Sequence, residues 1–248
     1  MKAAIKLLGL VLLAALALQL YFVARIAMMA VLNPESTAFQ RSEAYLITKN
    51  TGALKWRQQW VPYAGLSDHL KRAVIASEDA SFIEHEGVDM VALEKAWGKN
   101  SQAEQRAAQS ASRASARSSA LNVKPPKIIG GSTITQQLAK NLFLSGERTL
   151  LRKGQELLLS LLLEALLSKQ RILEIYLNNV EWGEGVFGAE AAAQRYFQKP
   201  ASKLSAYEAA RLAVMLPRPK YFETRPQSGY LASRASTIAA RMGGVELP

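Results

Sequence analysis

The segment GGSTITQQLAKN at residues 130–141 places three hydroxyl groups, two adjacent glutamines and a lysine where a helix is expected to begin. Thr133 and Gln136 have the T-x-x-Q spacing of a capping box, in which each side chain bonds the backbone N–H of the other residue. Capping explains these two residues. It leaves Gln137, Lys140 and Asn141 without a structural role, so the segment is also a candidate for chemistry.

Three further segments carry charged residues that can do chemistry: SEDASFIEHEG at residues 77–87, RTLLRKGQE at 148–156, and ILEIYLNNVEWGEGVFGAEAAAQRYF at 172–197. Each also has an ordinary structural interpretation. The adjacent acids of the first segment fit a solvated helix face, and Arg152 with Glu156 fits an i,i+4 salt bridge. Taken one at a time, the segments leave both interpretations open.

The composition excludes several classes of catalytic site. The chain has no cysteine, which removes disulfides, thiolate zinc sites and cysteine nucleophiles. Because His69 and His85 are its two histidines, we expect no histidine-based metal site. No G-x-S-x-G sequence is present to support a serine hydrolase. We expect no required cofactor and no metal site, while stimulation by Mg²⁺ or Mn²⁺ stays open.

The net charge of +11 indicates an anionic partner, which can be nucleic acid, a phosphorylated substrate or an acidic membrane surface. Much of the excess lies in residues 95–127, which hold seven basic residues against one acid. Residues 101–120 are rich in Ala, Ser, Arg and Gln and have no apolar periodicity. They predict a mobile, low-complexity insert at about residues 100–127, outside the core.

Residues 7–24 form an apolar stretch whose one polar member is Gln19. As a helix this stretch is about 27 Å long, close to the thickness of the hydrocarbon core of a bilayer. Lys2 and Lys6 precede it, so the positive-inside rule places the N-terminus in the cytoplasm. A cleaved signal peptide is the competing interpretation, but the apolar run continues past the small residues at 15–17. We predict a retained single-pass anchor in the inner membrane, with the remainder periplasmic or otherwise extracytoplasmic.

The chain divides into three parts on this basis. Residues 1–32 are the cytoplasmic N-terminus and transmembrane anchor, 33–65 a membrane-proximal irregular segment, and 66–248 the main domain. Residues 39–61 lack helical periodicity, and AYLIT at 44–48 is a candidate strand.

From residue 66 onward the pattern is helical, and the first helix begins at Ser67 or Asp68. The apolar core of a later helix, residues 157–167, contains Ser160 and Glu164 and is too short to cross a membrane. EWGEGVFG is predicted as a glycine-rich turn. The fold class is therefore mainly α. Further helices are predicted at residues 133–144, 148–167, 168–178, 189–197 and 205–216.

In this order, the four segments resemble the peptidoglycan glycosyltransferases of glycosyltransferase family 51, and specifically the monofunctional biosynthetic transglycosylases. The family pattern E-D-x-x-F-x-x-H-x-G is met at residues 78–87, and G-x-S-T-I-x-Q-Q-x-x-K-N at 130–141. R-K-x-x-E is met at 152–156 and Y-L-N at 176–178. The resemblance covers about residues 61–222, and the insert, which is longer than the family usually has, is its one departure. It implies a transmembrane helix followed by a lysozyme-like, bilobal all-α glycosyltransferase domain.

The resemblance also implies an activity. The family polymerises lipid II, an undecaprenyl-diphosphate-linked disaccharide pentapeptide, into β-1,4 glycan strands by an inverting displacement that releases undecaprenyl diphosphate. The resemblance assigns Glu78 the role of general base, which deprotonates the 4-hydroxyl of the acceptor sugar. Glu156 is the second catalytic carboxylate, expected to position the donor diphosphate or its cationic neighbours. The substrate-binding residues implied by the motifs are Asp79, Phe82, His85, Ser132, Thr133, Gln136, Gln137, Lys140, Asn141, Arg148, Arg152, Lys153 and Asn178.

The residue types suit this leaving group. A lipid diphosphate needs cations and hydrogen-bond donors aimed at its developing charge, and the motifs offer four cations together with the hydroxyl and amide groups of a helix start. The expected partners are lipid II, the growing glycan strand and membrane lipids, with cell-wall synthesis or division proteins left open and no nucleic acid.

Two other functions are weaker alternatives. A wall-degrading muramidase shares a helical fold and a catalytic glutamate, but its leaving group is a sugar hydroxyl that does not need four cations. A membrane-anchored, non-enzymatic binding protein accounts for the net charge but not for the motifs. No Ser-x-x-Lys occurs, so a transpeptidase domain is not expected and the enzyme is predicted to be monofunctional.

Overall fold

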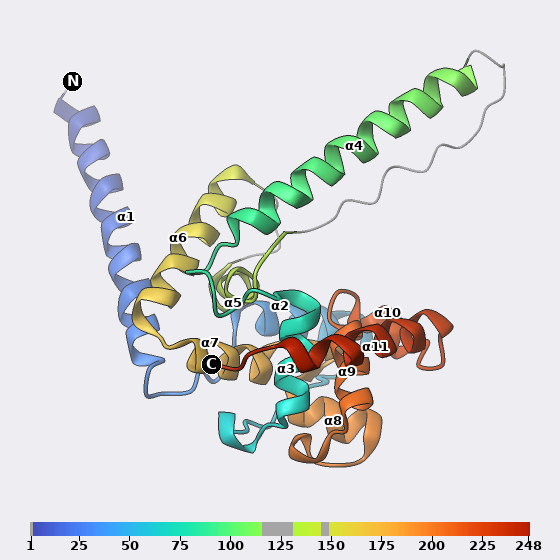
Figure 1. The fold of residues 1–248 in the computed structure, drawn as a ribbon. Helices are drawn as coiled ribbons and strands as arrows, with labels where there is room; N and C mark the ends of the chain where they lie inside the picture. The colour runs from blue at the N-terminus through green and yellow to red at the C-terminus, as the bar shows by residue number, and fades with distance from the viewer. Residues whose placement is uncertain (1, 116–130, 145–148) are drawn as a thin grey trace.

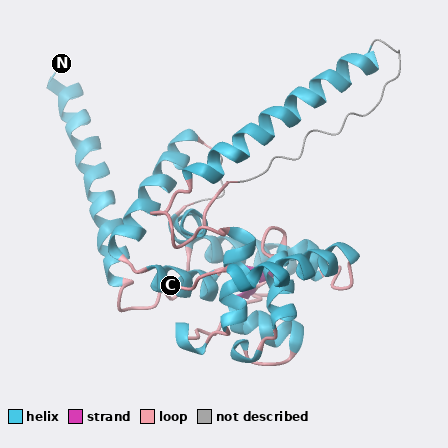
Figure 2. Ribbon diagram, in the orientation of Figure 1, coloured by secondary structure: helices cyan, strands magenta, loops and turns pink. Residues whose placement is uncertain are grey.

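The computed structural model describes residues 2–115, 131–144 and 149–248, and this part of the chain is dominated by helices (Figures 1 and 2). One two-stranded sheet, β1 (Glu181–Gly183) with β2 (Val186–Phe187), interrupts the helical fold. The helices in chain order are α1 (Lys2–Met28), α2 (Ala38–Thr51), α3 (Asp68–Glu78), α4 (Met90–Ser115), α5 (Ile134–Phe143), α6 (Leu150–Leu166), α7 (Lys169–Asn179), α8 (Ala189–Phe197), α9 (Ala206–Met215), α10 (Pro219–Glu223) and α11 (Gly229–Arg241).

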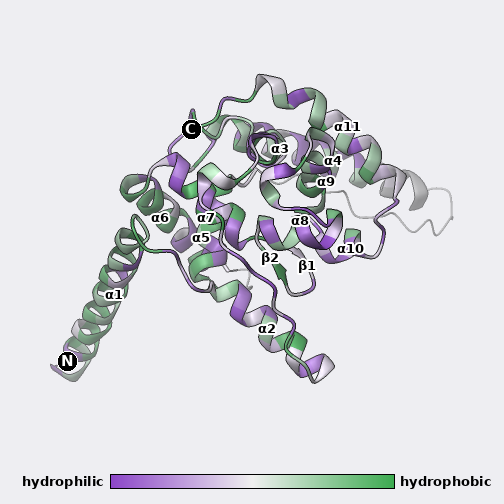
Figure 3. Ribbon diagram, turned by 90° about the horizontal axis from the view of Figure 1, so that it is seen from below, coloured by the Kyte–Doolittle hydropathy of each residue, from purple (hydrophilic) through white to green (hydrophobic). Residues whose placement is uncertain are grey.

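Helix α1 is the one described helix long and apolar enough to cross a membrane. It projects from the rest of the chain as an apolar rod, green along its length in Figure 3. Its C-terminal end joins the domain, because Phe22 and Ile26 are buried in the core and the Phe22 ring lies 5.3 Å from that of Phe143. Gln19, the polar residue of the apolar stretch, donates to Gln155 of α6 at 3.1 Å. The predicted apolar helix is confirmed, and it is fastened to the domain.

The predicted strand at residues 44–48 is wrong, and the segment at 33–65 is not irregular throughout, because α2 occupies its centre. Thr37 and Gln40 form a capping box, in which Thr37 Oγ1 accepts from the Gln40 N–H at 3.0 Å and Gln40 Oε1 accepts from the Thr37 N–H at 2.9 Å. Gln40 also donates to the Asn179 carbonyl at 3.1 Å. Capping and this contact with α7 override the strand propensity of AYLIT.

The predicted insert also differs from the structure. Helix α4 runs on to Ser115, so the first part of residues 101–120 is helical, not irregular. Alanine, glutamine and arginine are good helix formers, and α4 continues through them without an apolar face of its own. Residues 116–130, which complete the predicted insert, lie outside the described residues.

The remaining helices surround one core. Helix α3 packs against α9 and α11, while α5 packs against α6 and α7. Polar caps fix where several of them begin, and Ser67, Thr133, Thr149, Ser168 and Ser205 each accept from a backbone N–H of the first turn. The six helices predicted from the sequence in this part of the chain (α3 and α5 to α9) begin within two residues of their predicted positions, whereas α4, α10 and α11 had no predicted start. The mainly α class is confirmed, with the small sheet as its departure.

The glycine-rich turn forms that sheet. Glu181 pairs with Phe187 and Gly183 with Val186. Gly185 has a φ of 70°, and a Cβ there would lie 2.4 Å from the Lys55 carbonyl oxygen, so no other residue fits without displacement. The close approach lets residue 57 exchange backbone hydrogen bonds with the hairpin.

Candidate active site

Glu78 is the last residue of α3, and its carboxylate is partly buried. Gln137 Nε2 donates to Glu78 Oε2 at 3.1 Å, and Ser77 Oγ donates to Oε1 at 3.3 Å. Burial raises the pKa of Glu78 above the ordinary glutamate value, whereas the hydrogen bonds from Gln137 and Ser77 act in the opposite direction. A carboxylate with a raised pKa that still reaches solvent is suited to accept a proton.

Gln137 lies on α5 and is held from both ends of its amide. Its Nε2 contacts Glu78, and its Oε1 accepts from the Tyr176 hydroxyl at 2.9 Å. Tyr176 is 1% exposed, and burial raises the pKa of its phenol well above the ordinary value, so it stays a donor. Tyr176 was not among the site residues predicted from the sequence, and its position in the Y-L-N motif was the available signal for this contact.

A cavity of about 350 Å³ opens next to Gln137 and gathers most of the predicted substrate-binding residues. It lies along the length of α5 and beside the first turns of α6, with Phe39 and Leu144 as apolar lining. The predicted residues that line it are Ser132, Gln136, Gln137, Lys140, Asn141, Arg152, Lys153 and Glu156.

The cations of this cavity surround one buried carboxylate. Glu156 is 4% exposed, accepts from Arg152 Nη1 at 2.8 Å, and forms an ion pair with Lys153. Arg152 Nε is buried, and no described group bonds it. Desolvation lowers the pKa of Lys140; Glu156 raises it, and the neighbouring Arg152 and Lys153 lower it. The cavity is thus cationic overall, with Glu156 as the internal counter-charge.

A second, smaller cavity of about 210 Å³ lies on the Glu78 side. Glu78, Asp79, Thr133 and Ser132 line it, and Ser132 lines the first cavity as well. The two cavities therefore meet at the start of α5. This places the candidate base and the candidate anion site on either side of Ser132 and Gln137.

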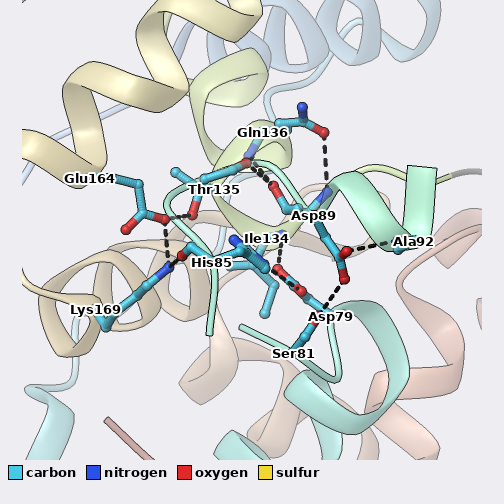
Figure 4. A network of polar contacts seen from close by, with 12 residues as sticks. Asp79, Ser81, His85, Asp89, Ala92, Ile134, Thr135, Gln136, Glu164 and Lys169 are labelled. Atoms are coloured by element: carbon cyan, nitrogen blue, oxygen red, sulfur yellow. Dashed lines mark hydrogen bonds and ion pairs between the residues drawn. The ribbon is translucent and has the colours of Figure 1, made fainter. Parts of the chain in front are cut away.

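Asp79 joins the end of α3 to the start of α5 (Figure 4). Its Oδ1 lies 2.8 Å from His85 Nε2, and its Oδ2 accepts from the Ile134 N–H at 2.9 Å. Asp79 is 7% exposed, so both oxygens are used inside the fold. These contacts position Glu78, the neighbouring residue, relative to α5.

A second network, absent from the sequence prediction, supports the same region (Figure 4). Glu164 of α6 accepts from Thr135 Oγ1 at 2.6 Å and from Lys169 Nζ at 2.8 Å. Lys169 also donates to the His85 carbonyl and lies 4.6 Å from the centre of the Phe82 ring. The charge of Glu164 inside an otherwise apolar run was the signal for a buried partner.

Three predicted substrate-binding residues make their main contacts inside the fold, and two of them, Phe82 and Asn178, line neither of these cavities. Phe82 and Asn178 are fully buried, and Asn178 bonds both backbone groups of Val61 at 2.8 and 2.9 Å. Thr133 caps α5 and donates to the Gly87 carbonyl at 2.6 Å. The structure gives these three residues positioning contacts, because the polar side-chain atoms of Asn178 and Thr133 already have partners and the Phe82 ring lies in the hydrophobic core. Arg148, predicted as a substrate-binding cation, lies outside the described residues.

Within the described ranges, no group of three or more His, Asp or Glu side chains is arranged to hold a metal ion. The cavity beside α5 and α6 carries the cations Lys140, Arg152 and Lys153, and Glu78 lies next to it as a candidate base.

Comparison with known proteins agrees with this geometry. The Transglycosylase family model matches residues 46–243. The chain is 53% identical to the biosynthetic peptidoglycan transglycosylase of Burkholderia thailandensis over 94% of its own length and 83% of that protein. It is 50% identical to the protein of the same description from Burkholderia orbicola, over 94% and 86% of the two chains. The chain therefore belongs to the transglycosylase family, and the resemblance and the lysozyme-like helical domain predicted from the sequence are confirmed.

Proposed function

We propose that this chain is a peptidoglycan glycosyltransferase that polymerises lipid II into β-1,4 glycan strands and releases undecaprenyl diphosphate. The observation that carries the proposal is the Gln137 bridge, which joins the candidate base Glu78 at 3.1 Å to the wall of a cation-lined cavity. In glycosyl transfer from a diphosphate donor, the base acts at the anomeric carbon and the cations act on the diphosphate attached to it. The base and the cation site must therefore lie no farther apart than the length of one sugar. Family membership supports the same reaction class.

Glu78 acts as the general base in this mechanism. It accepts the proton of the acceptor's 4-hydroxyl as that oxygen attacks the anomeric carbon of the donor sugar. The bond from the anomeric carbon to the diphosphate breaks, and its electron pair leaves with the diphosphate. Because attack and departure occur on opposite faces, an α-linked donor gives a β-linked product.

The cavity at α5 and α6 stabilises the leaving group. Lys140 and Arg152 carry the positive charge that the departing diphosphate requires, and Ser132 adds a neutral donor at the start of α5. Arg152 Nε is buried and no described group accepts from it, so the guanidinium keeps an N–H that a bound anion could use. Arg148 is proposed as a further cation of this site from its motif position.

Glu156 has a positioning role in this proposal. Its two oxygens are occupied by Arg152 and Lys153, so it is not available to take a proton from substrate. It holds the two cations at the cavity wall and offsets part of their mutual repulsion.

The enzyme is proposed to work at the outer face of the inner membrane. Lys2 and Lys6 at the start of α1 favour an inside N-terminus, which places the domain outside the cytoplasm. Leu150 and Leu151, at the start of α6 beside the cavity, are 92% and 89% exposed, which suits contact with lipid. An anchored enzyme meets its lipid-linked substrates within the membrane plane.

Incubation of the purified full-length chain with labelled lipid II tests the function. We expect a polymer that a muramidase digests to disaccharide units. If the chain leaves lipid II intact and cleaves finished glycan, the polymerase assignment fails and the muramidase alternative replaces it.

A further inference from the structure

A third cavity lies away from the candidate active site, where α1 leaves its helical course and turns toward α2. Its volume is about 490 Å³. Charged side chains (Arg25, Glu35 and Arg41) and apolar or aromatic ones (Tyr21, Met28 and Leu32) share its walls. Neither the proposed reaction nor the motifs use these residues.

The charges around this cavity are not neutralised by the protein. Within the described part of the chain, no ion pair involves Arg25, Glu35 or Arg41. Arg41 donates from Nη1 to the carbonyl and hydroxyl oxygens of Ser36, at 3.1 and 3.0 Å, which fixes the side chain at the cavity. Two cations and one carboxylate thus face a shared space without pairing with one another.

The wall of the cavity is held in place by α7. Arg171 donates to the carbonyls of Met29 at 2.7 Å and Leu32 at 2.9 Å, and to Asn33 Oδ1 at 2.8 Å. Arg171 is itself oriented by an ion pair with Glu174. Three hydrogen bonds from α7 therefore hold the turn after α1.

The position of the cavity along α1 gives its expected depth in a membrane. The apolar stretch at residues 7–24 spans about 27 Å, so Arg25 falls where the hydrocarbon core ends and lipid phosphates begin. Tyr21, 55% exposed one turn earlier, is a typical interfacial aromatic. Leu32, 58% exposed and four residues after the end of α1, adds apolar surface to the same cavity.

We propose that this cavity binds the headgroup of a zwitterionic bilayer phospholipid that carries a primary ammonium. Arg25 and Arg41 contact its phosphate, Glu35 contacts its ammonium, and Tyr21 with Leu32 contacts the glycerol and upper acyl chain. The separate cations and carboxylate match the separate charges of such a headgroup, whereas an anionic headgroup meets Glu35 as a like charge. The inference rests on the proposed membrane anchor but not on the glycosyltransferase mechanism.

The test measures lipid binding and not polymerisation. The full-length chain is placed in phosphatidylcholine vesicles with a trace of phosphatidylethanolamine, phosphatidylglycerol or phosphatidylcholine bearing the same spin-labelled acyl chain. The motionally restricted fraction of each probe reports its relative affinity. We expect restriction to be strongest for phosphatidylethanolamine.

Variants identify the residues responsible. Arg25→Gln with Arg41→Gln is expected to lower phosphatidylethanolamine affinity about three- to tenfold, since charge-assisted hydrogen bonds are lost. Glu35→Gln is expected to shift preference from phosphatidylethanolamine toward phosphatidylglycerol. The matched control is Lys203→Gln with Arg241→Gln, which also removes two positive charges, but at exposed positions outside the cavity. Circular dichroism checks that each variant is folded.

Three results would overturn the proposal. The first is an equal motionally restricted fraction for the three lipid probes, and the second is an equal loss of phosphatidylethanolamine affinity in the control double variant. The third is displacement of the probe by a lipid-linked diphosphate, which would make the cavity a substrate subsite. Flotation of the chain with the vesicles tests the anchor separately, and the lipid II assay tests the enzyme separately. A failure of the lipid site is thereby distinguished from a failure of either.

Discussion

Gln137 Nε2 donates to the Glu78 carboxylate at 3.1 Å, across a sequence separation of 59 residues. The contact joins the C-terminal end of α3 to the first turns of α5, and it decides which way the carboxylate points. It also adjusts proton affinity, because a hydrogen bond to the charged form opposes the effect of burial.

Replacing the base tests its role directly. Glu78→Gln keeps the size of the side chain but cannot accept the acceptor's proton. General-base catalysis contributes about 10²–10⁴-fold, so polymerisation of lipid II should fall at least about 100-fold. Binding of a lipid-linked diphosphate should survive, because the cations of the α5–α6 cavity are untouched. Normal turnover by a folded variant would remove Glu78 from the mechanism.

The pH dependence should respond to Gln137. Turnover requires ionised Glu78, so kcat/KM should fall as pH drops through the raised pKa of this carboxyl. In Gln137→Ala the carboxylate loses a donor, its pKa rises further, and the acidic limb moves to higher pH. The measurement is a pH profile of kcat/KM for both proteins. A limb that stays in place, or moves to lower pH, would show that Gln137 does not act on Glu78.

Positioned charge should matter more than total charge. Lys140→Ala removes a cation from the cavity and should cost about 2–4 kcal/mol of transition-state stabilisation, in line with the loss of one preorganised donor. Lys203→Ala removes the same charge from an exposed helical turn and should leave kcat/KM nearly unchanged. Arg148→Ala should behave like Lys140→Ala. Equal effects at Lys140 and Lys203 would mean that bulk charge governs the reaction.

Glu156 should act through its partners. Glu156→Gln leaves Arg152 and Lys153 without their shared counter-charge, so both side chains should lose their fixed positions. We expect weaker binding of a lipid-linked diphosphate, read as a higher KM, together with a lower kcat. The acidic limb of the kcat/KM profile should stay at the pH of the parent chain, because the ionisation of Glu78 sets it. A shift of that limb in Glu156→Gln would instead make Glu156 a titrating participant.

Stability should depend on Glu181 of β1. Burial raises its pKa to about 7, although Lys220 nearby lowers it. Since the folded pKa exceeds the unfolded value of 4.5, the protonated carboxyl stabilises the fold at acid pH, and this contribution is lost as pH rises through about 7.

Glu181→Gln should therefore be more stable than the parent chain above that pH, by on the order of 2–3 kcal/mol, and nearly equal to it below about pH 4. Thermal unfolding of both proteins in detergent at the two pH values measures the difference. A constant difference across the range would show that Glu181 does not titrate there.

The sequence by itself determined the features that depend on local spacing. The capping box of Thr133 and Gln136 was readable because its partners are three residues apart, and the apolar length of α1 was readable from residues 7–24. The ion pair of Arg152 with Glu156 was predictable because residues four apart lie next to each other on a helix. Motif order then sufficed to identify the family.

Tertiary structure decided what depends on distant segments. Residues 44–48 have strand propensity but lie in α2. The start of this helix is capped by Thr37 and Gln40, and Gln40 also donates to the Asn179 carbonyl of α7. The motif alone did not distinguish Asn178, whose amide is consumed by the backbone of Val61, from Gln137, whose amide faces Glu78. Both are amide side chains within motifs of the family pattern. Which polar atoms remain for substrate is set by the partners that packing brings to them, and those partners come from elsewhere in the chain.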